Sequence, residues 1–318
     1  MMKKMPKIRM ITRETATETF ERFLLTKRAH GIKTKTVDTY SQHFHAISKH
    51  LDTSREVAEM TSEDLQNMII SMQESALSPN SIKSYTITLK AFLSWCNSEG
   101  ITNLNIAKYK GEETIKETYT DDELSVLLQK PNMKKCSFAE YRSWVIINFL
   151  VNCGCRASTI RYIQNRDVDL DSHVIYARHT KNRKALVIPL CSEMVLVLRE
   201  YMKIRCGEPE DFLFCNEHGE QLTENGLRCS IVAYNRRRGL QKTSIHLFRH
   251  TFARKYLIDC GGNAFTLQKL LGHSTLDMTK HYCEIFDADI AKNFDSFSPL
   301  EQMKASKSTK IQMNPKRR

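Results

Sequence analysis

Three short clusters of arginine, histidine and tyrosine in this sequence have the residue types needed to cleave a phosphodiester. The first is the run Asn-Cys-Gly-Cys-Arg, which ends at Arg156. The second is His246-Leu-Phe-Arg249-His, in which a spacing of three places His246 and Arg249 on one face of a helix. The third is Leu-Leu-Gly-His273-Ser-Thr, and Tyr282 follows it. Together these clusters predict attack on phosphorus by a tyrosine, without a metal ion.

Cleavage without a metal makes two demands that these residues can meet. The transition state spreads negative charge over the non-bridging oxygens, and the planar fork of an arginine matches two phosphate oxygens. Arg156 and Arg249 are therefore predicted to clamp the phosphate. A phenol has a pKa of about 10, so Tyr282 needs a proton acceptor and a positive field. His246 is predicted to accept the proton, and the two arginines supply the field.

Two more residues complete the predicted catalytic set. Lys181 lies in the basic run at 180–184, and a lysine at the tip of a hairpin there can protonate the leaving 5′-oxygen. Gly272 is predicted to end one helix and Ser274 to cap the next, with Asp277 as the third residue of that helix. This arrangement places His273 in the corner between the two helices, near the nucleophile.

The first part of the chain, 15–105, predicts a compact unit of four helices. Their apolar residues recur at helical spacing between polar turns. The predicted starts are the capping pair Thr15 and Glu18, residue 36, the capping pair Thr61 and Asp64, and Pro79. The first helix runs to about His30, the second to residue 51, and the fourth ends before Gly100. Residues 1–14 form a basic extension before this unit.

A second domain is predicted at 119–300, after a charged, non-periodic linker at 106–118. Its first helices are expected at 121–129, 139–152 and 156–164. Two β-prone runs, 174–178 and 185–189, flank a basic segment and predict a β-hairpin. Helical patterning resumes at residue 192 and continues almost to Pro299, before a basic tail at 301–318. The fold class is mainly α with a small β-hairpin or sheet, so the second domain is mixed α+β.

The charge of the chain favours a polyanionic partner. The 318 residues carry a formal net charge of +12, with a pI near 9.2, and nucleic acid is the commonest polyanion met by a basic protein. The candidate DNA-contacting residues are Lys33, Lys35, Lys83, Lys90, Arg236, Arg237 and Arg238. Each of them is equally compatible with a solvated surface charge.

The remaining composition predicts a cytosolic protein without a cofactor. No signal peptide opens the chain, and its longest apolar run is too short to cross a bilayer, so the ten cysteines are expected to be reduced. No Cys-x-x-Cys or His-Glu-x-x-His motif is present. His43, His45 and His50 share one predicted helix, and we interpret them as surface or partly buried residues and not as metal ligands.

Three other functions fit parts of the pattern. Cys155 and Arg161 have the spacing of the Cys-x5-Arg loop of cysteine phosphatases, but the segment before them is predicted to be a helix, whereas that loop follows a strand. A DNA-binding regulator with the same fold and no catalysis would be expected to have lost part of the catalytic set. A type IB topoisomerase would share the chemistry, although the short two-domain layout favours a recombinase.

The order Arg156, Lys181, His246-x-x-Arg249, His273 and Tyr282 resembles the active site of the tyrosine site-specific recombinases, the phage integrase and Xer-like family. The resemblance covers about 15–299. It implies the catalytic roles given above and a SAM-like core-binding domain in the first unit. One departure stands out, because Thr159 occupies a position where the family usually has an acidic residue that supports the first arginine.

The resemblance also implies how the protein works and with what. The two domains would clamp double-stranded DNA, and Tyr282 would form a 3′-phosphotyrosyl link without metal or ATP. A homotetramer would act on paired DNA sites, with the apolar segment 285–297 as a candidate docking helix between copies. Accessory DNA-bending or directionality factors and a prokaryotic, nucleoid-associated location in the cytoplasm are further expectations.

Overall fold

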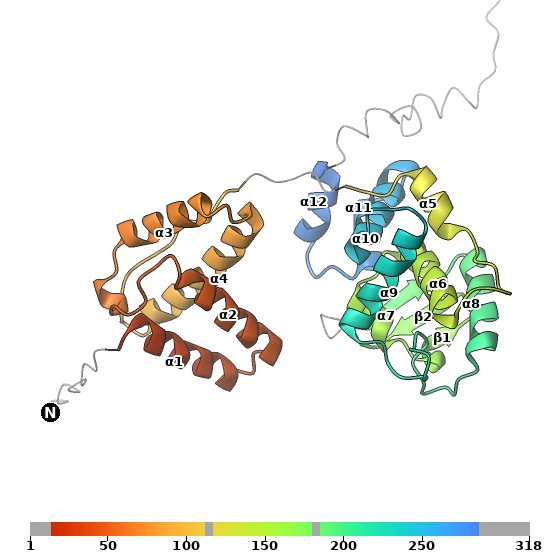
Figure 1. The fold of residues 1–318 in the computed structure, drawn as a ribbon, viewed down its shortest axis with the longest axis horizontal. Helices are drawn as coiled ribbons and strands as arrows, with labels where there is room; N and C mark the ends of the chain where they lie inside the picture. Colours follow the sequence, from red (N-terminus) through yellow and green to blue (C-terminus); the bar gives the residue numbers. More distant parts are fainter. Residues whose placement is uncertain (1–13, 112–116, 180–184, 286–318) are drawn as a thin grey trace, which may run out of the picture. The chain divides into compact units, whose positions relative to one another are not determined.

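The chain folds into two compact units. The computed structural model describes residues 14–111, 117–179 and 185–285, and the units are Met1–Thr114 and Ile115–Arg318 (Figure 1). Each unit has a hydrophobic core of its own. The predicted fold class is confirmed, because the described residues are mainly helical and include one small sheet.

Four α-helices form the first unit, as the periodicity predicts. They are α1 (Ala16–Ala29), α2 (Thr34–Ile47), α3 (Ser62–Glu74) and α4 (Pro79–Ser98), with a 3-10 turn at Val57–Glu59. The capping boxes predicted at Thr15 and Thr61 are both present. The predicted end of the second helix was wrong. Leu51 is buried as its apolar character requires, but it lies in the turn that follows α2.

Aromatic rings fill the centre of the first unit. The rings of Phe20 and Phe44 stack with 3.8 Å between their centroids. Phe92 meets them edge-on, at 5.1 Å from Phe20 and 5.9 Å from Phe44. Ile106, which follows α4 along the chain, is buried in the same core. The helices α1, α2 and α4 are therefore held together around Phe92 by contacts from inside this unit.

The second unit is built around α6 (Phe138–Cys153). This helix is apolar along most of its length, and it packs against α5, α8, α9 and α10. A helix that is apolar on all sides must be covered on all sides. The covering helices are α5 (Asp121–Leu128), α8 (Ser192–Arg205), α9 (Glu224–Arg237) and α10 (Ile245–Arg254).

A three-stranded antiparallel sheet, in the order β1-β2-β3, lies in the second unit. Its strands are β1 (Val168–Asp169), β2 (Val174–Ala177) and β3 (Leu186–Pro189). The predicted hairpin is confirmed, since Tyr176 pairs with Val187 and Ile175 with Ile188. The third strand, β1, was not predicted, because two residues are too few to show an alternating pattern. The hairpin tip, 180–184, lies outside the described residues.

The helical pattern predicted to continue after residue 192 is interrupted, and its longest break lies between α8 and α9. α8 ends at Arg205, and Cys206 takes a left-handed conformation with φ of +49°. Residues 206–223 are irregular, although Leu213 and Phe214 are fully buried. Gly207 and Pro209 explain the break, because both residues disfavour the continuation of a helix.

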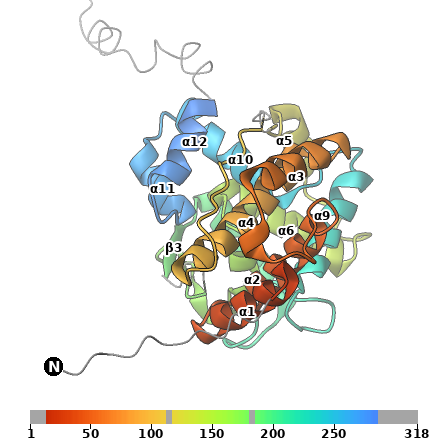
Figure 2. The same ribbon diagram turned by 90° about the vertical axis from the view of Figure 1, so that its left-hand side faces the viewer.

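The last described helices lie together in space. α10 runs on into a π-helical turn at Lys255–Asp259, and α11 (Ala264–Leu271) and α12 (Asp277–Ile285) follow it. α12 packs on both α10 and α11 (Figures 1 and 2). The predicted cap at Ser274 was wrong, because α12 begins only at Asp277 and residues 273–276 are irregular. This group of three helices carries most of the candidate site.

Among the described residues, no helix is both long and apolar enough to cross a membrane. No group of three or more histidine, cysteine, aspartate or glutamate side chains in the same part of the chain is placed to hold a metal ion. His43 and His50 instead contact hydroxyl groups, with Nδ1 2.8 Å from Thr88 Oγ1 and 2.9 Å from Ser71 Oγ, respectively.

The aromatic core of the first unit is expected to set the stability of that unit alone. Phe92→Ala should lower the free energy of unfolding of α1–α4 by about 3–5 kcal/mol, because it leaves a cavity among three rings. Hydrogen exchange of the whole chain measures this, as faster exchange in α1–α4. Leu25→Ala is the control, since Leu25 is 62% exposed. Equal acceleration in α6 would contradict the independence of the two cores.

Candidate active site

The turn after α6 presents the first arginine. Gly154 ends α6 with φ of +57°, and Arg156 is the N-cap residue of α7 (Ala157–Tyr162). Residues other than glycine disfavour this φ. A Cβ on Gly154 would also lie 2.5 Å from the ring of Phe252. The Cys-Gly-Cys-Arg sequence therefore folds as a tight turn in which α10 approaches the backbone of Gly154 closely.

The second arginine, Arg249, lies in α10 and is held by backbone carbonyls. Its side chain is buried, with 5% of the residue exposed. Nη1 donates to the Gly154 carbonyl at 3.0 Å, and Nη2 donates to the Leu271 carbonyl at 2.9 Å. Nη2 also lies 2.6 Å from Nε2 of His273. Arg249 thus ties the turn after α6 to the end of α11.

Arg156, like Arg249, donates to a backbone carbonyl at the end of α11. Its Nη1 donates to the Gly272 carbonyl at 3.2 Å. Burial lowers the pKa of Arg156, and the charge of Arg249 lowers it further. Thr159, which stands where an acidic residue was expected, is buried, and the Gly272 carbonyl supports the Arg156 guanidinium.

The two guanidinium groups form a positive site. Among the described residues, neither Arg156 nor Arg249 forms an ion pair with a carboxylate. Burial lowers the pKa of Arg249 as well, while the neighbouring phenol of Tyr282 raises it. Buried charge is costly unless it is paired. The site is therefore arranged to receive an anion.

His273 follows the left-handed Gly272 that ends α11. Its Nδ1 lies 2.8 Å from Thr279 Oγ1, and its Nε2 faces Arg249. Burial and then the charges of Arg249 and Arg156 lower the pKa of His273 to about 4. The imidazole is consequently neutral at physiological pH. The sequence correctly placed this residue in the corner before α12.

Tyr282 lies in α12, on the side that packs against α10 and α11. It is 6% exposed and belongs to a small apolar cluster with Ala253, Ile258, Leu267 and Leu271. Its ring is nearly parallel to that of His273, at 9° and 6.0 Å between centroids. A hydrogen bond between Tyr282 and Arg249 raises the pKa of the arginine. The predicted nucleophile and the second predicted arginine are therefore in contact within one chain.

The two histidines of α10 differ in their surroundings. His246, the predicted proton acceptor, is exposed in the first turn of the helix. His250 is half-buried, and its ring centroid lies 5.4 Å from that of Tyr282. Sequence analysis missed His250 as a neighbour of the nucleophile. His250 directly follows Arg249 and lies one turn after His246, so its spacing from the arginine did not mark it as a site residue.

The remaining predicted catalytic residue, Lys181, lies outside the described residues. Cys155, the nucleophile of the alternative cysteine-phosphatase loop, lies within the described residues. Cys155 is buried, follows a helix, and burial raises its pKa well above the usual range. A phosphatase nucleophile needs a thiolate at low pKa. The Cys-x5-Arg spacing to Arg161 therefore has no phosphatase role here.

The candidate DNA-contacting residues fall into two groups. Lys33, Lys35 and Lys90 are exposed on the first unit, and Lys83 is half-buried there. Arg238, in the second unit, stacks over the Tyr234 ring at 3.7 Å and pairs with Glu140 at 3.4 Å. Arg237 also approaches Glu140, at 3.9 Å, and Arg236 is exposed. Arg238 thus has a structural role that its charge did not reveal.

A groove on the first unit adds a residue that sequence analysis missed. It has a volume of about 190 Å³ and is lined by Lys83, Thr86, Ile87, Lys90, Ala107 and Lys108. Lys83 and Lys90 are two turns apart on α4, and Lys108 comes from the segment that follows the helix. Only the fold brings Lys108 to the other two lysines.

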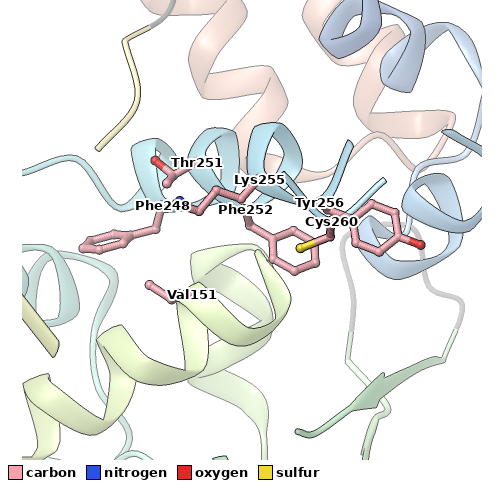
Figure 3. Close-up of a pocket in the computed structure, with 7 residues that line it drawn as sticks. All are labelled: Val151, Phe248, Thr251, Phe252, Lys255, Tyr256 and Cys260. Carbon is pink, nitrogen blue, oxygen red and sulfur yellow. The ribbon is translucent and has the colours of Figure 1, made fainter. Parts of the chain in front are cut away.

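The second unit contains an apolar cavity of about 200 Å³. Figure 3 shows its lining, which comes from α6, α10 and the π-helical turn: Val151, Phe248, Thr251, Phe252, Lys255, Tyr256 and Cys260. Phe252 separates this cavity from the turn at Gly154. The ring therefore supports the turn whose carbonyl holds Arg249.

Adding a side chain at Gly154 is expected to destabilise the fold more than the left-handed backbone alone would explain. Gly154→Ala should lower the free energy of unfolding by about 2–4 kcal/mol, because it combines a left-handed alanine with a clash against Phe252. Gly219→Ala is the matched control, since Gly219 has φ of +82° and open space around it. Urea denaturation measures both. Equal losses in the two variants would contradict the close approach of Phe252.

Comparison with known proteins agrees with this geometry. The model of the phage integrase family matches residues 117–288, and that of the phage integrase N-terminal SAM-like domain matches residues 18–100. The tyrosine recombinase XerC of Shewanella amazonensis is 24% identical over 294 residues, which cover 90% of this chain and 97% of the relative. XerC of Thermodesulfovibrio yellowstonii is 28% identical over 228 residues, covering 68% and 74%.

Solved structures share the fold at low sequence identity. A lambda integrase dimer bound to a COC′ core site has a TM-score of 0.70 and 20% identity, covering 85% of this chain and 95% of that one. The Tn1549 transposon integrase in complex with a circular intermediate DNA has a TM-score of 0.69 and 20% identity, covering 84% and 94%. Since the catalytic family model alone spans more than half of the sequence, the chain belongs to the phage integrase family.

Proposed function

We propose that this chain is a site-specific recombinase that cuts and rejoins double-stranded DNA through a 3′-phosphotyrosyl link to Tyr282. The observation that carries the proposal is the pair formed by the buried Arg249 and the half-buried Arg156, which have no carboxylate partner among the described residues. Arg249 is also hydrogen-bonded to Tyr282. A site of this kind favours an anion with several oxygens, and a phosphodiester offers two non-bridging ones. Membership of the phage integrase family supports the same reaction.

The predicted catalytic residues that the structure describes have these roles in the proposed reaction. Arg156 and Arg249 hold the non-bridging oxygens of the scissile phosphate and stabilise the charge that develops on them. The oxygen of Tyr282 bonds to phosphorus as the bond to the 5′-oxygen breaks. The phenol proton passes to His246, which lies on the same face of α10 as Arg249.

The 5′-oxygen of the leaving strand must gain a proton. It takes this proton from Lys181, whose role rests on the sequence alone. The 5′-hydroxyl of a partner strand then attacks the phosphotyrosine, and the phenol recovers its proton. Because the phosphoester bond is conserved in the covalent intermediate, rejoining requires neither ATP nor a metal ion.

The proposal includes the assembly and its setting. Four copies act on two paired DNA sites, with accessory DNA-bending or directionality factors, at the nucleoid of a prokaryotic cell. Lambda integrase, which shares the fold, has been solved as a tetramer bound to a Holliday junction, with a TM-score of 0.69. The proposed docking segment between copies, 285–297, lies almost wholly outside the described residues.

The lysine groove of the first unit is the proposed phosphate contact outside the catalytic unit. Lys90 and Lys108 are exposed, and they line the groove together with Lys83. The hydroxyl-bearing residue of the groove, Thr86, is buried and donates to the Lys83 carbonyl at 2.9 Å. The lysine ammonium groups therefore supply the attraction for DNA phosphates in this groove.

The covalent intermediate gives a direct test of the proposal. Nicked suicide DNA from the regions that flank the gene should form a covalent adduct with the wild-type chain in the presence of EDTA, because no metal takes part. Tyr282→Phe should form none, since it lacks the nucleophilic oxygen. Tyr256→Phe is the control, because Tyr256 packs against the same apolar cluster. An adduct in Tyr282→Phe, or none in the wild type, would overturn the proposal.

The groove predicts a salt-dependent loss of affinity. Lys90→Ala combined with Lys108→Ala should reduce the salt slope of DNA binding by about 2, because each phosphate contact releases about one counter-ion. Fluorescence anisotropy at about 50 to 200 mM salt measures this slope. Lys49→Ala combined with Lys134→Ala removes the same charge from exposed positions outside the groove. Equal slopes for the two double variants would rule out the groove as a specific contact.

A further inference from the structure

Thr279 lies one helical turn before Tyr282 on α12 and is fully buried, with 0% exposure. Its hydroxyl oxygen lies 2.8 Å from Nδ1 of His273. A threonine in a helix has lower intrinsic helix propensity than most residues, and a buried hydroxyl needs a partner. The hydrogen bond with His273 gives this hydroxyl its partner in the catalytic corner.

The contacts of His273 determine which nitrogen carries its proton. Nε2 lies 2.6 Å from Nη2 of Arg249, and a guanidinium can only donate. Nε2 must therefore accept, so it has no proton. A neutral imidazole has a single N–H, which is then on Nδ1 and donates to Thr279 Oγ1.

We propose that Thr279 is a positioning residue: it fixes the tautomer and the ring plane of His273 and thereby aims one N–H of Arg249 beside Tyr282. The inference rests on the proposed recombinase function for its effect on the reaction, but the tautomer is independent of it. A chain of contacts, Thr279 to His273 to Arg249, joins the nucleophile helix to the phosphate clamp. It also holds the His273 ring parallel to that of Tyr282.

The alternative tautomer shows why an acceptor at this position matters. Without the threonine oxygen, the N–H at Nδ1 would be buried without a partner, which favours transfer of the proton to Nε2. An N–H at Nε2 would then face the donor Nη2 of Arg249, and two donors repel. The His273 ring or the guanidinium of Arg249 would have to turn away, and a misplaced clamp slows phosphoryl transfer.

Two substitutions at Thr279 separate the hydrogen bond from packing. Thr279→Val keeps the branched shape and removes the acceptor, and it is expected to slow covalent adduct formation on suicide DNA by about 10- to 100-fold. Thr279→Ser keeps the acceptor and should stay within about threefold of wild type. Thr266→Val makes the same chemical change at an exposed position of α11 and should have no effect. DNA affinity and thermal unfolding are measured for all three variants.

Nitrogen NMR of histidine-labelled protein reads the tautomer without any reaction. The His273 signals, assigned by their loss in His273→Gln, should show a protonated Nδ1 in the wild type and in Thr279→Ser. Thr279→Val should show a shift of the proton toward Nε2. A wild-type proton on Nε2, or Thr279→Val with unchanged tautomer and a rate within twofold of wild type, would overturn the inference. Absence of any adduct in the wild type, with the expected tautomer, would overturn the function alone.

Discussion

The second unit depends on holding two positive side chains close together without a carboxylate to neutralise them. Arg156 and Arg249 are kept in place by the carbonyl oxygens of Gly154, Leu271 and Gly272 and by one histidine nitrogen. Carbonyl dipoles offset part of the desolvation cost without cancelling the charge. The local chain must therefore point three carbonyls inward, and the left-handed glycines at 154 and 272 make this possible.

The same constraint explains the arrangement of the helices around the site. α6 is buried on most sides, so the turn at its end has a fixed position against α10. α11 supplies the other carbonyls, and α12 returns to place the tyrosine against both helices. Rigid elements thus position the charged groups, and β3 of the sheet packs against α11. A site built on helix ends keeps its geometry more accurately than one built on long loops.

The sequence predicted which side chains lie together at the candidate site better than it predicted what holds them there. The residue types and order identified Arg156, Arg249, His273 and Tyr282, because the demands of phosphate chemistry restrict which side chains can act together. The sequence selected His246 by its spacing from Arg249 and did not reveal that the ring of His250 lies beside that of Tyr282. It could not show that Arg238 is bound by Glu140, or that Lys108 joins Lys83 and Lys90, because such partners are brought together only by folding.

The buried position of Tyr282 has a consequence for selectivity. In the DNA-free chain, the phenol is shielded from solvent and shares Arg249, the group that a phosphate would also engage. Substrate and nucleophile therefore compete for the same donor before the reaction begins. A phosphate can displace Tyr282 from Arg249 only if the ligand that carries it also binds through many other contacts. Free phosphate in the cell is therefore not expected to do so. In the proposed reaction, the DNA-free chain would therefore hold its nucleophile in a latent state until a DNA site is bound.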